Sequence, residues 1–133
     1  MRSGLLFADG NLTWSANTAP KANEDGILTA QEVSTLDLRK AQIVTLSACE
    51  TGLGEIKGSE GVYGLQRSFK LAGAKMIIIS LWQVPDKETS EFMIYFYKFM
   101  MRKKDPKIAF SAAQKEMNKK YAPYFWAAFV LVD

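Results

Sequence analysis

Two short apolar runs, separated by the pattern of a helix, constrain the fold of this sequence most. The runs cover residues 42–48 and 75–81, and each is rich in Ile, Val or Leu on both faces, which is typical of buried parallel strands. Residues 61–72 lie between them and repeat apolar side chains at helical spacing, with Gly73 as a helix-ending residue. The apolar stripe consists of Val62, Leu65, Phe69 and Ala72. The alternation of strand, helix and strand predicts an α/β fold.

The segment before the first run shows weaker signals. Residues 5–8 predict a minor strand, which opens a hairpin at the turn signal of residues 9–11. Thr29 and Glu32 have the spacing of a capping box, in which each side chain accepts the backbone N–H of the other residue. We therefore expect a short helix through about Thr35.

Two helices and a last strand are predicted after the second run. Asp86 is expected to cap a helix that reaches about Met101, and Asp105 to cap another that has Pro106 at its first position. The inner faces are Phe92, Met93, Phe96, Phe99 and Met100 in the first helix, and Ala109, Ala112, Ala113 and Met117 in the second. Residues 126–132 predict the final strand, so we expect a sheet with helices on both faces.

The composition is that of a globular protein, and 133 residues correspond to one domain or part of one. No apolar run approaches the ~20 residues of a membrane-spanning helix, and the N-terminal segment has no secretory cleavage site. One cysteine permits no internal disulfide, which suits the reducing cytoplasm that we expect for this chain. The net charge is only +3. The basic residues at 102–104 therefore predict a solvated helix end, and neither a nucleic acid nor a membrane is expected as a partner.

The single cysteine, Cys49, follows the first apolar run directly. A turn with Gly52 and Gly54 comes next, and then the helix of residues 61–72. A nucleophile is commonly placed in this way, because a side chain at the carboxyl end of a buried strand emerges at the edge of the sheet. Backbone N–H groups of the turn and of the helix N-terminus would lower the pKa of such a thiol and stabilise an oxyanion. Cys49 is therefore the candidate catalytic residue.

Other interpretations of this segment stay open. Cys49 also fits a cysteine of the core or one that forms a disulfide with a second chain. A metal site is disfavoured, because one cysteine and no histidine leave too few soft ligands. The glycine spacing matches neither a Gly-x-Gly-x-x-Gly nor a Walker loop, so phosphate binding is disfavoured and no cofactor is expected.

Several separated motifs resemble the CHAT domain, a caspase-like peptidase domain that is usually found beside TPR repeats. They are Ser3 to Leu6, Gly26 to Ala30, Ser47 to Gly52, Gly61 to Phe69, Leu71 to Ala74, Ser80 to Asp86 and Trp126 to Phe129. The resemblance covers essentially the whole chain. It implies a caspase-like three-layer sandwich with a mostly parallel sheet flanked by helices. It also implies a His–Cys dyad peptidase that acts on a protein substrate in signalling or defence, with Cys49 as nucleophile.

Four residues are expected to contact a peptide substrate. Glu50 and Asp86 are the carboxylates nearest the expected cleft, and Gly52 lets backbone approach the peptide. Asp86 would select a basic side chain, although it also fits the cap of the following helix. Trp82 would wall the pocket, with core packing as the other interpretation.

The sequence departs from the family pattern because it holds no histidine. We therefore expect the C-terminal part of a CHAT domain, inactive alone, whose missing N-terminal half supplies the histidine and whose parent protein carries TPR repeats. Without that half, the strand at residues 42–48 would leave an open edge, so we expect poor solubility or self-association. The alternative is a non-catalytic interaction or scaffold module, whose partner is a regulatory protein.

Overall fold

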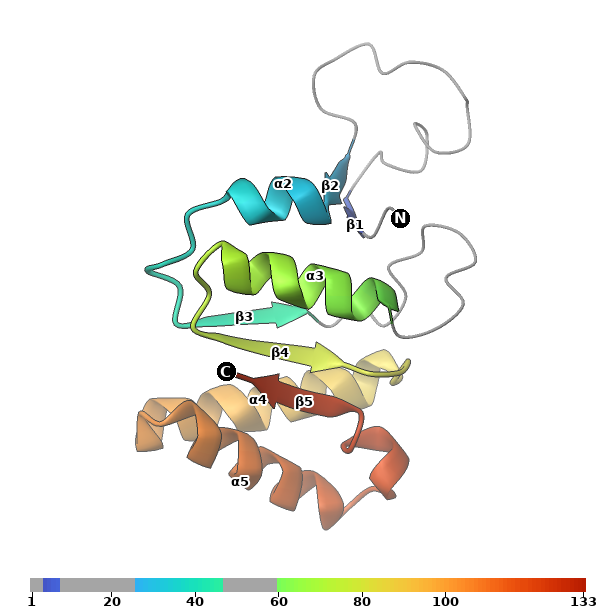
Figure 1. Cartoon of the computed structure of the whole chain (residues 1–133). Coiled ribbons are helices and arrows are strands. Elements are labelled where there is room, and N and C mark those ends of the chain that lie inside the picture. Colours follow the sequence, from blue (N-terminus) through green and yellow to red (C-terminus); the bar gives the residue numbers. More distant parts are fainter. Residues whose placement is uncertain (1–3, 8–25, 47–59) are drawn as a thin grey trace. The chain divides into compact units, whose positions relative to one another are not determined.

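The computed structural model describes residues 4–7, 26–46 and 60–133. These residues form both helices and strands (Figure 1), which confirms the α/β class. The chain divides into two compact units, residues 1–44 with 50–75 and residues 45–49 with 76–133. Each unit has a hydrophobic core of its own.

The first unit combines a two-stranded sheet with two helices. Strand β1 (Gly4–Leu6) pairs antiparallel with β2 (Ile27–Thr29). Helix α2 (Ala30–Thr35) follows β2 directly and packs against α3 (Glu60–Leu71). The short strand predicted at residues 5–8 is thus present, but its partner β2 was not predicted, and the hairpin turn lies outside the described residues.

The capping box at the start of α2 is confirmed. The backbone N–H of Thr29 donates to Glu32 Oε2 at 2.7 Å, and the backbone N–H of Glu32 donates to Thr29 Oγ1 at 3.3 Å. The helix ends after Thr35, as the sequence predicts. Val33 is fully buried and gives this short helix its anchor in the core of the first unit.

Helix α3 ends as its sequence predicts, with Gly73 in the left-handed region at φ +99°. The N–H of Ala74 donates to the carbonyl of Phe69, and the N–H of Gly73 donates to that of Lys70, each at 3.0 Å. These two hydrogen bonds together form the Schellman motif. A Cβ at Gly73 would lie 2.7 Å from the side chain of Arg39, so the position requires glycine on two grounds.

The second unit contains most of the main sheet. The strand order in this sheet is β3 (Ile43–Leu46), β4 (Met76–Ser80) and β5 (Phe129–Val132). Strands β4 and β5 pair antiparallel with Ser80 opposite Phe129, whereas the arrows of β3 and β4 point the same way in Figure 1. The sheet is therefore mixed rather than uniformly parallel.

The two predicted central strands differ in burial. Residues 77–80 of β4 are all buried, which confirms the prediction for that strand. All four residues of β3 are only half-buried, so the prediction of a fully buried strand there is wrong for the described part. The reason is its place at the end of the strand order, with β4 as its one neighbour among the described strands.

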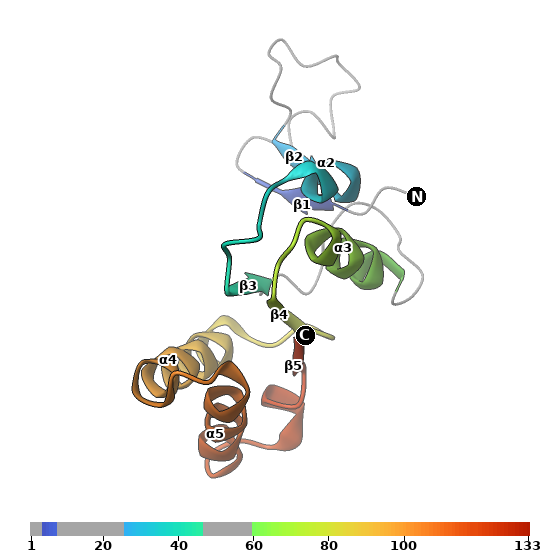
Figure 2. The ribbon, with the colours of Figure 1, turned by 60° about the vertical axis from the view of Figure 1, so that its left-hand side comes forward.

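Two long helices and a short 3₁₀ helix complete the second unit. Helix α4 (Asp86–Lys103) and α5 (Pro106–Asn118) lie side by side (Figures 1 and 2), and η1 (Pro123–Phe125) leads into β5. The final strand begins at Phe129 and not at the predicted residue 126. The N–H groups of Trp126 and Ala127 instead bond to the carbonyl of Pro123, which keeps these residues in a turn.

An aromatic cluster forms the core between these helices and β5. Phe92 and Phe96 of α4 are completely buried. The ring of Phe92 stacks on Phe129 with centroids 4.3 Å apart and meets Phe110 edge-on at 5.4 Å. Three predicted inner residues of α5 are also completely buried: Ala109, Ala113 and Met117. The other predicted inner residues are only half-buried, namely Met93, Phe99, Met100 and Ala112.

Candidate functional site

The predicted site residues fall into two groups. Cys49, Glu50 and Gly52 lie outside the described residues, so the structure does not place them. Trp82 and Asp86 are described, and both follow the carboxyl end of β4. This end of β4 is therefore the part of the candidate site that has a defined geometry.

The chain is held firmly where it leaves β4. The Ser80 hydroxyl donates to the carbonyl of Trp82 at 2.6 Å, so the chain turns immediately after the strand. The N–H of Leu81 donates to the carbonyl of Ala128 at 2.9 Å, which continues the hydrogen bonding between β4 and β5 by one residue. Ser80 is buried, and its hydroxyl fixes the direction in which the following segment departs.

Trp82 and its neighbour Gln83 are held by hydrogen bonds with Tyr124 of η1. This contact was not predicted from the sequence. The indole N–H of Trp82 donates to the carbonyl of Tyr124 at 2.9 Å, and the Tyr124 hydroxyl donates to the carbonyl of Gln83 at 3.0 Å. Their ring centroids lie 6.0 Å apart with a tilt of 32°. Trp82 is half-buried and Tyr124 is exposed. The pair thus presents a fixed, partly open aromatic surface beside the end of β4.

Asp86 does not cap α4, which corrects one predicted role. The N-cap residue is Pro85, which has no side chain able to accept a hydrogen bond, and Asp86 is the first helical residue. The hydroxyl of Thr89 donates to the carbonyl of Val84 at 3.3 Å and so helps to fix this end of the helix. The Asp86 side chain is exposed, and it has no hydrogen bond or ion pair with any other described residue.

The comparisons with known proteins agree with the sequence motifs that resemble the CHAT domain. The family described as the CHAT domain matches residues 1–133. The chain belongs to the CHAT-domain family. It is 30% identical over 109 residues to "Tetratricopeptide repeat protein 28" of Homo sapiens, and 30% identical over 110 residues to the protein of that name from Mus musculus.

The region aligned with this chain is a small part of each relative. Each alignment covers 80% of this chain but 4% of the relative. No solved structure matches the chain. The comparisons therefore establish the family and its occurrence in proteins named for TPR repeats.

A polar cluster joins α4 to the turn that follows α5. Lys120 Nζ donates to Glu91 Oε1 at 2.5 Å and lies 2.6 Å from the hydroxyl of Tyr95. The hydroxyl of Tyr121 donates to Glu91 Oε2 at 2.6 Å. The hydrogen bond from Lys120 is the largest cause that lowers the pKa of Glu91 to about 2, with a further contribution from Tyr121. The cluster fastens the two helices together.

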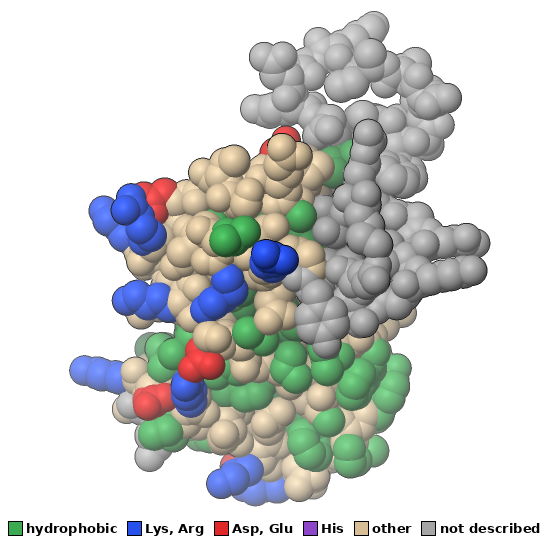
Figure 3. Space-filling model, viewed as in Figure 1, with side chains coloured by type: hydrophobic (Ala, Val, Ile, Leu, Met, Phe, Trp, Pro, Cys, Tyr) green, Lys and Arg blue, Asp and Glu red, His purple; other side chains and the backbone are tan. Residues whose placement is uncertain are grey.

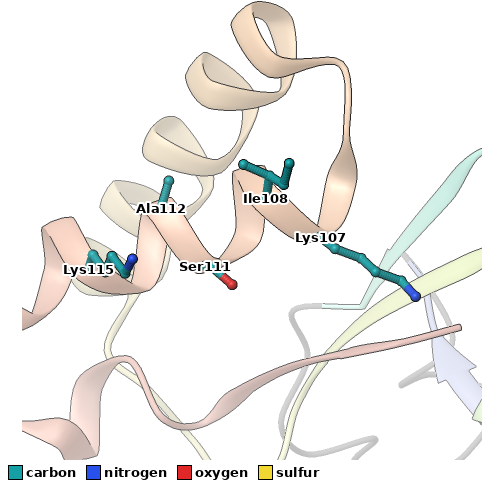
Figure 4. A pocket seen from close by; sticks show the side chains of 5 residues that line it. All are labelled: Lys107, Ile108, Ser111, Ala112 and Lys115. Atoms are coloured by element: carbon teal, nitrogen blue, oxygen red, sulfur yellow. The ribbon is translucent and has the colours of Figure 1, made fainter.

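A shallow groove of about 350 Å³ runs along the exposed side of α5. Ile108 and Ala112 project to one side of the helix and Ser111 to the other (Figure 4). Lys107 and Lys115 complete the lining, and Lys107 forms an ion pair with Asp133. Its polar groups do not converge, so the groove has no features of a ligand site.

The described ranges contain neither a cluster of metal-binding residues nor a membrane-spanning helix. No group of three or more His, Cys, Asp or Glu residues that could hold a metal ion occurs among residues 4–7, 26–46 and 60–133. In the same ranges, no helix is both long and apolar enough to span a bilayer.

Proposed function

We propose that Cys49 is the nucleophile of a cysteine peptidase of the His–Cys dyad type. The observation that carries the proposal is the order of a strand, a cysteine and a glycine-rich segment in a member of the CHAT-domain family. Strand β3 ends at Leu46, three residues before Cys49. The 133 residues hold no histidine, so the base comes from residues outside them, and these residues alone do not hydrolyse peptides.

The chemistry requires a thiolate and one proton carrier. The imidazole takes the proton of the Cys49 thiol, and the thiolate adds to the carbonyl carbon of the scissile peptide bond. The C–N bond breaks as the imidazolium protonates the departing amine. Water, which loses a proton to the same imidazole, then cleaves the thioester and releases the carboxylate. The free thiol that this cycle needs suits a cytoplasmic location.

We assign substrate contacts to four further residues. Gly52 lets backbone approach the peptide, and Glu50 lies beside the nucleophile in the sequence. Trp82, which Tyr124 holds half-exposed, supplies an apolar wall. Asp86 carries an exposed carboxylate without a described partner, which favours a basic side chain in the substrate. The caspase-like three-layer sandwich belongs to the same proposal.

The test begins with the DNA upstream of Met1. The proposal expects a histidine that ends a strand pattern shortly before Ser3, and a longer protein that includes it. In that protein an iodoacetamide probe should label Cys49 near neutral pH faster than it labels a free thiol, and Cys49→Ala should remove both labelling and cleavage of a protein substrate. The 133-residue chain is the matched comparison, in which cleavage is not expected.

Asp86→Asn in the longer protein tests the assigned specificity. The expected result is a weaker preference for a basic residue, with labelling of Cys49 unchanged. Cysteine reactivity no greater than that of a free thiol in the longer protein would contradict the catalytic assignment, because an activated nucleophile has a lowered pKa.

The absence of histidine favours a second candidate function, a non-catalytic interaction or scaffold module. In this alternative the fold binds a regulatory protein, beside TPR repeats such as those named in the relatives. An authentic translation start at Met1, with no upstream reading frame, would support it. Self-association through the outer edge of β3 belongs instead to the first proposal, in which the N-terminal half of the domain is missing, and a monodisperse monomer of the 133-residue chain would contradict that expectation.

A further inference from the structure

Three large apolar side chains on α4 are exposed and lie in a row. The exposed fractions are 62% for Ile94, 48% for Tyr97 and 82% for Met101. Residues three and four positions apart share one side of a helix, so the three side chains form a continuous stripe over two turns. Contiguous exposed apolar surface of this kind marks an interaction site more often than isolated exposed residues do.

Part of the stripe is held in place by the rest of the second unit. The Tyr97 hydroxyl lies 3.2 Å from Thr45 Oγ1 of β3, and the Tyr97 ring meets the buried Phe96 edge-on at 5.1 Å. Ile94 and Met101 therefore flank a ring that is already fixed. A preorganised surface loses little side-chain entropy on binding.

Of the unpaired charged residues along this stripe, three are cations and one, Asp86 at the start of α4, is a carboxylate. Lys98 lies four positions after Ile94, Arg102 lies four positions after Lys98, and Lys87 lies two turns before Ile94. All three are exposed, and none has an ion pair with another described residue. Glu91 lies at the border of the stripe, three positions before Ile94, and its charge is paired with that of Lys120. The stripe with its three cations is called the α4 outer face below.

This combination of charges selects among the possible occupants. A second copy of the chain would bring together two faces that each carry a net positive charge, which is unfavourable. A membrane surface would require a broader apolar face than one stripe of three residues. A helix that carries apolar residues with glutamates or aspartates beside them matches both features, because such a helix docks through side chains at spacings of three, four and seven.

We propose that the α4 outer face binds an acidic amphipathic helix of a protein partner. The apolar residues of that helix would cover Ile94 and Met101, and its carboxylates would lie beside Lys98 and Arg102. Cys49 takes no part in this interaction, so the inference stands apart from the peptidase proposal.

Fluorescence anisotropy with the full 133-residue chain tests the proposal. The probe is a labelled helical peptide with leucines on one side and glutamates beside them, and its twin has lysine at every glutamate position. The glutamate peptide should bind more weakly as salt increases, because exposed ion pairs are screened. The lysine twin should not bind. Met101→Glu and Lys98→Glu should each weaken binding at least about tenfold, which is the usual effect of removing an interface anchor.

The matched control is Ile108→Glu, which places the same charge on an exposed apolar residue of α5. It should leave binding unchanged, and circular dichroism should show that all variants fold alike. The proposal is overturned if the glutamate peptide does not bind, if the lysine twin binds equally, or if Ile108→Glu weakens binding as much as Met101→Glu does. Binding to anionic vesicles in place of the peptide, or dimerisation that Met101→Glu abolishes, would also overturn it.

Discussion

The two sides of α4 use the same kinds of residues for opposite purposes. On the inner side, Phe92 is fully buried and stacked on Phe129, and at the border Glu91 is bound by Lys120. On the outer side, Ile94 and Met101 are exposed, although they are as apolar as core residues. Hydrophobic side chains also gather over the second unit on the face seen in Figure 3, so exposed apolar surface is not confined to the α4 outer face. An apolar stripe therefore becomes core only where another element covers it.

The largest expected effect separates the two sides by stability. Phe92→Ala should lower the free energy of unfolding by about 3–5 kcal/mol, because it leaves a cavity beside the rings of Phe110 and Phe129. Met101→Ala, on the exposed side, should change it by less than about 0.5 kcal/mol. Urea unfolding of the chain, followed by circular dichroism, measures both. Equal losses would mean that the outer side is covered in solution, and the contrast would then fail.

A second comparison concerns the starts of α4 and α5. Asp105→Ala should destabilise the chain by about 1 kcal/mol, because Asp105 accepts the N–H groups of Lys107 at 2.9 Å and Ile108 at 3.3 Å. Asp86→Ala should have less than half that effect, since it loses only a favourable position at the helix N-terminus. The measurement is the urea midpoint. A loss at Asp86 as large as that at Asp105 would show a structural role and weaken its assignment to substrate.

The sequence predicted the features that depend only on residues close together in the chain. The capping box at Thr29, the Schellman end at Gly73 and the cap at Asp105 were all found, because each depends on residues within one turn. The buried strand β4 was also predicted, since three consecutive isoleucines leave no polar face. Local chemistry thus gave most helix ends and the central strand.

Features that depend on distant parts of the chain were missed. The partial exposure of β3 follows from its place in the sheet, which no local pattern records. The grip of Tyr124 on Trp82 joins residues that are 42 positions apart. The aromatic run at residues 124–126 was a possible signal, because a partly buried tyrosine or tryptophan usually bonds through its polar atom. Asp86 was misread as a cap because the residue before it, Pro85, already occupies that place.

A smaller effect is expected at the turn between α4 and α5. The conformation of this turn determines which side of α4 is covered by α5. Lys104 lies in the left-handed region at φ +57°, where a residue other than glycine is strained by about 1 kcal/mol or more. Lys104→Gly should therefore stabilise the chain by about 0.5 kcal/mol, after the entropy of glycine in the unfolded chain is deducted. Lys115→Gly, inside α5, is the control and should cost about 1 kcal/mol. Loss of stability at Lys104 would show that its side chain makes a contact that outweighs the backbone strain.

The smallest expected effect is a pH dependence confined to the border between the two sides of α4. The pKa of Glu91 is lowered from 4.5 to about 2 in the folded chain, chiefly by the hydrogen bond from Lys120. A group with a lowered pKa stabilises the fold above its unfolded pKa, and that contribution is lost as the pH falls toward the folded pKa. The pKa of Lys120 is raised, so its share persists up to at least about pH 10.5. Stability from this pair should therefore be constant near neutrality and decline between about pH 4.5 and 2. The effect is small because pairs near the surface contribute little.

Thermal unfolding of Glu91→Gln and of the parent chain at pH 7 and pH 3 measures this effect. The stabilities of the two proteins should differ more at pH 7 than at pH 3. A difference that stays the same at both values would mean that the ion pair does not fasten α4 to α5, and the polar half of the contrast between the two sides would be lost.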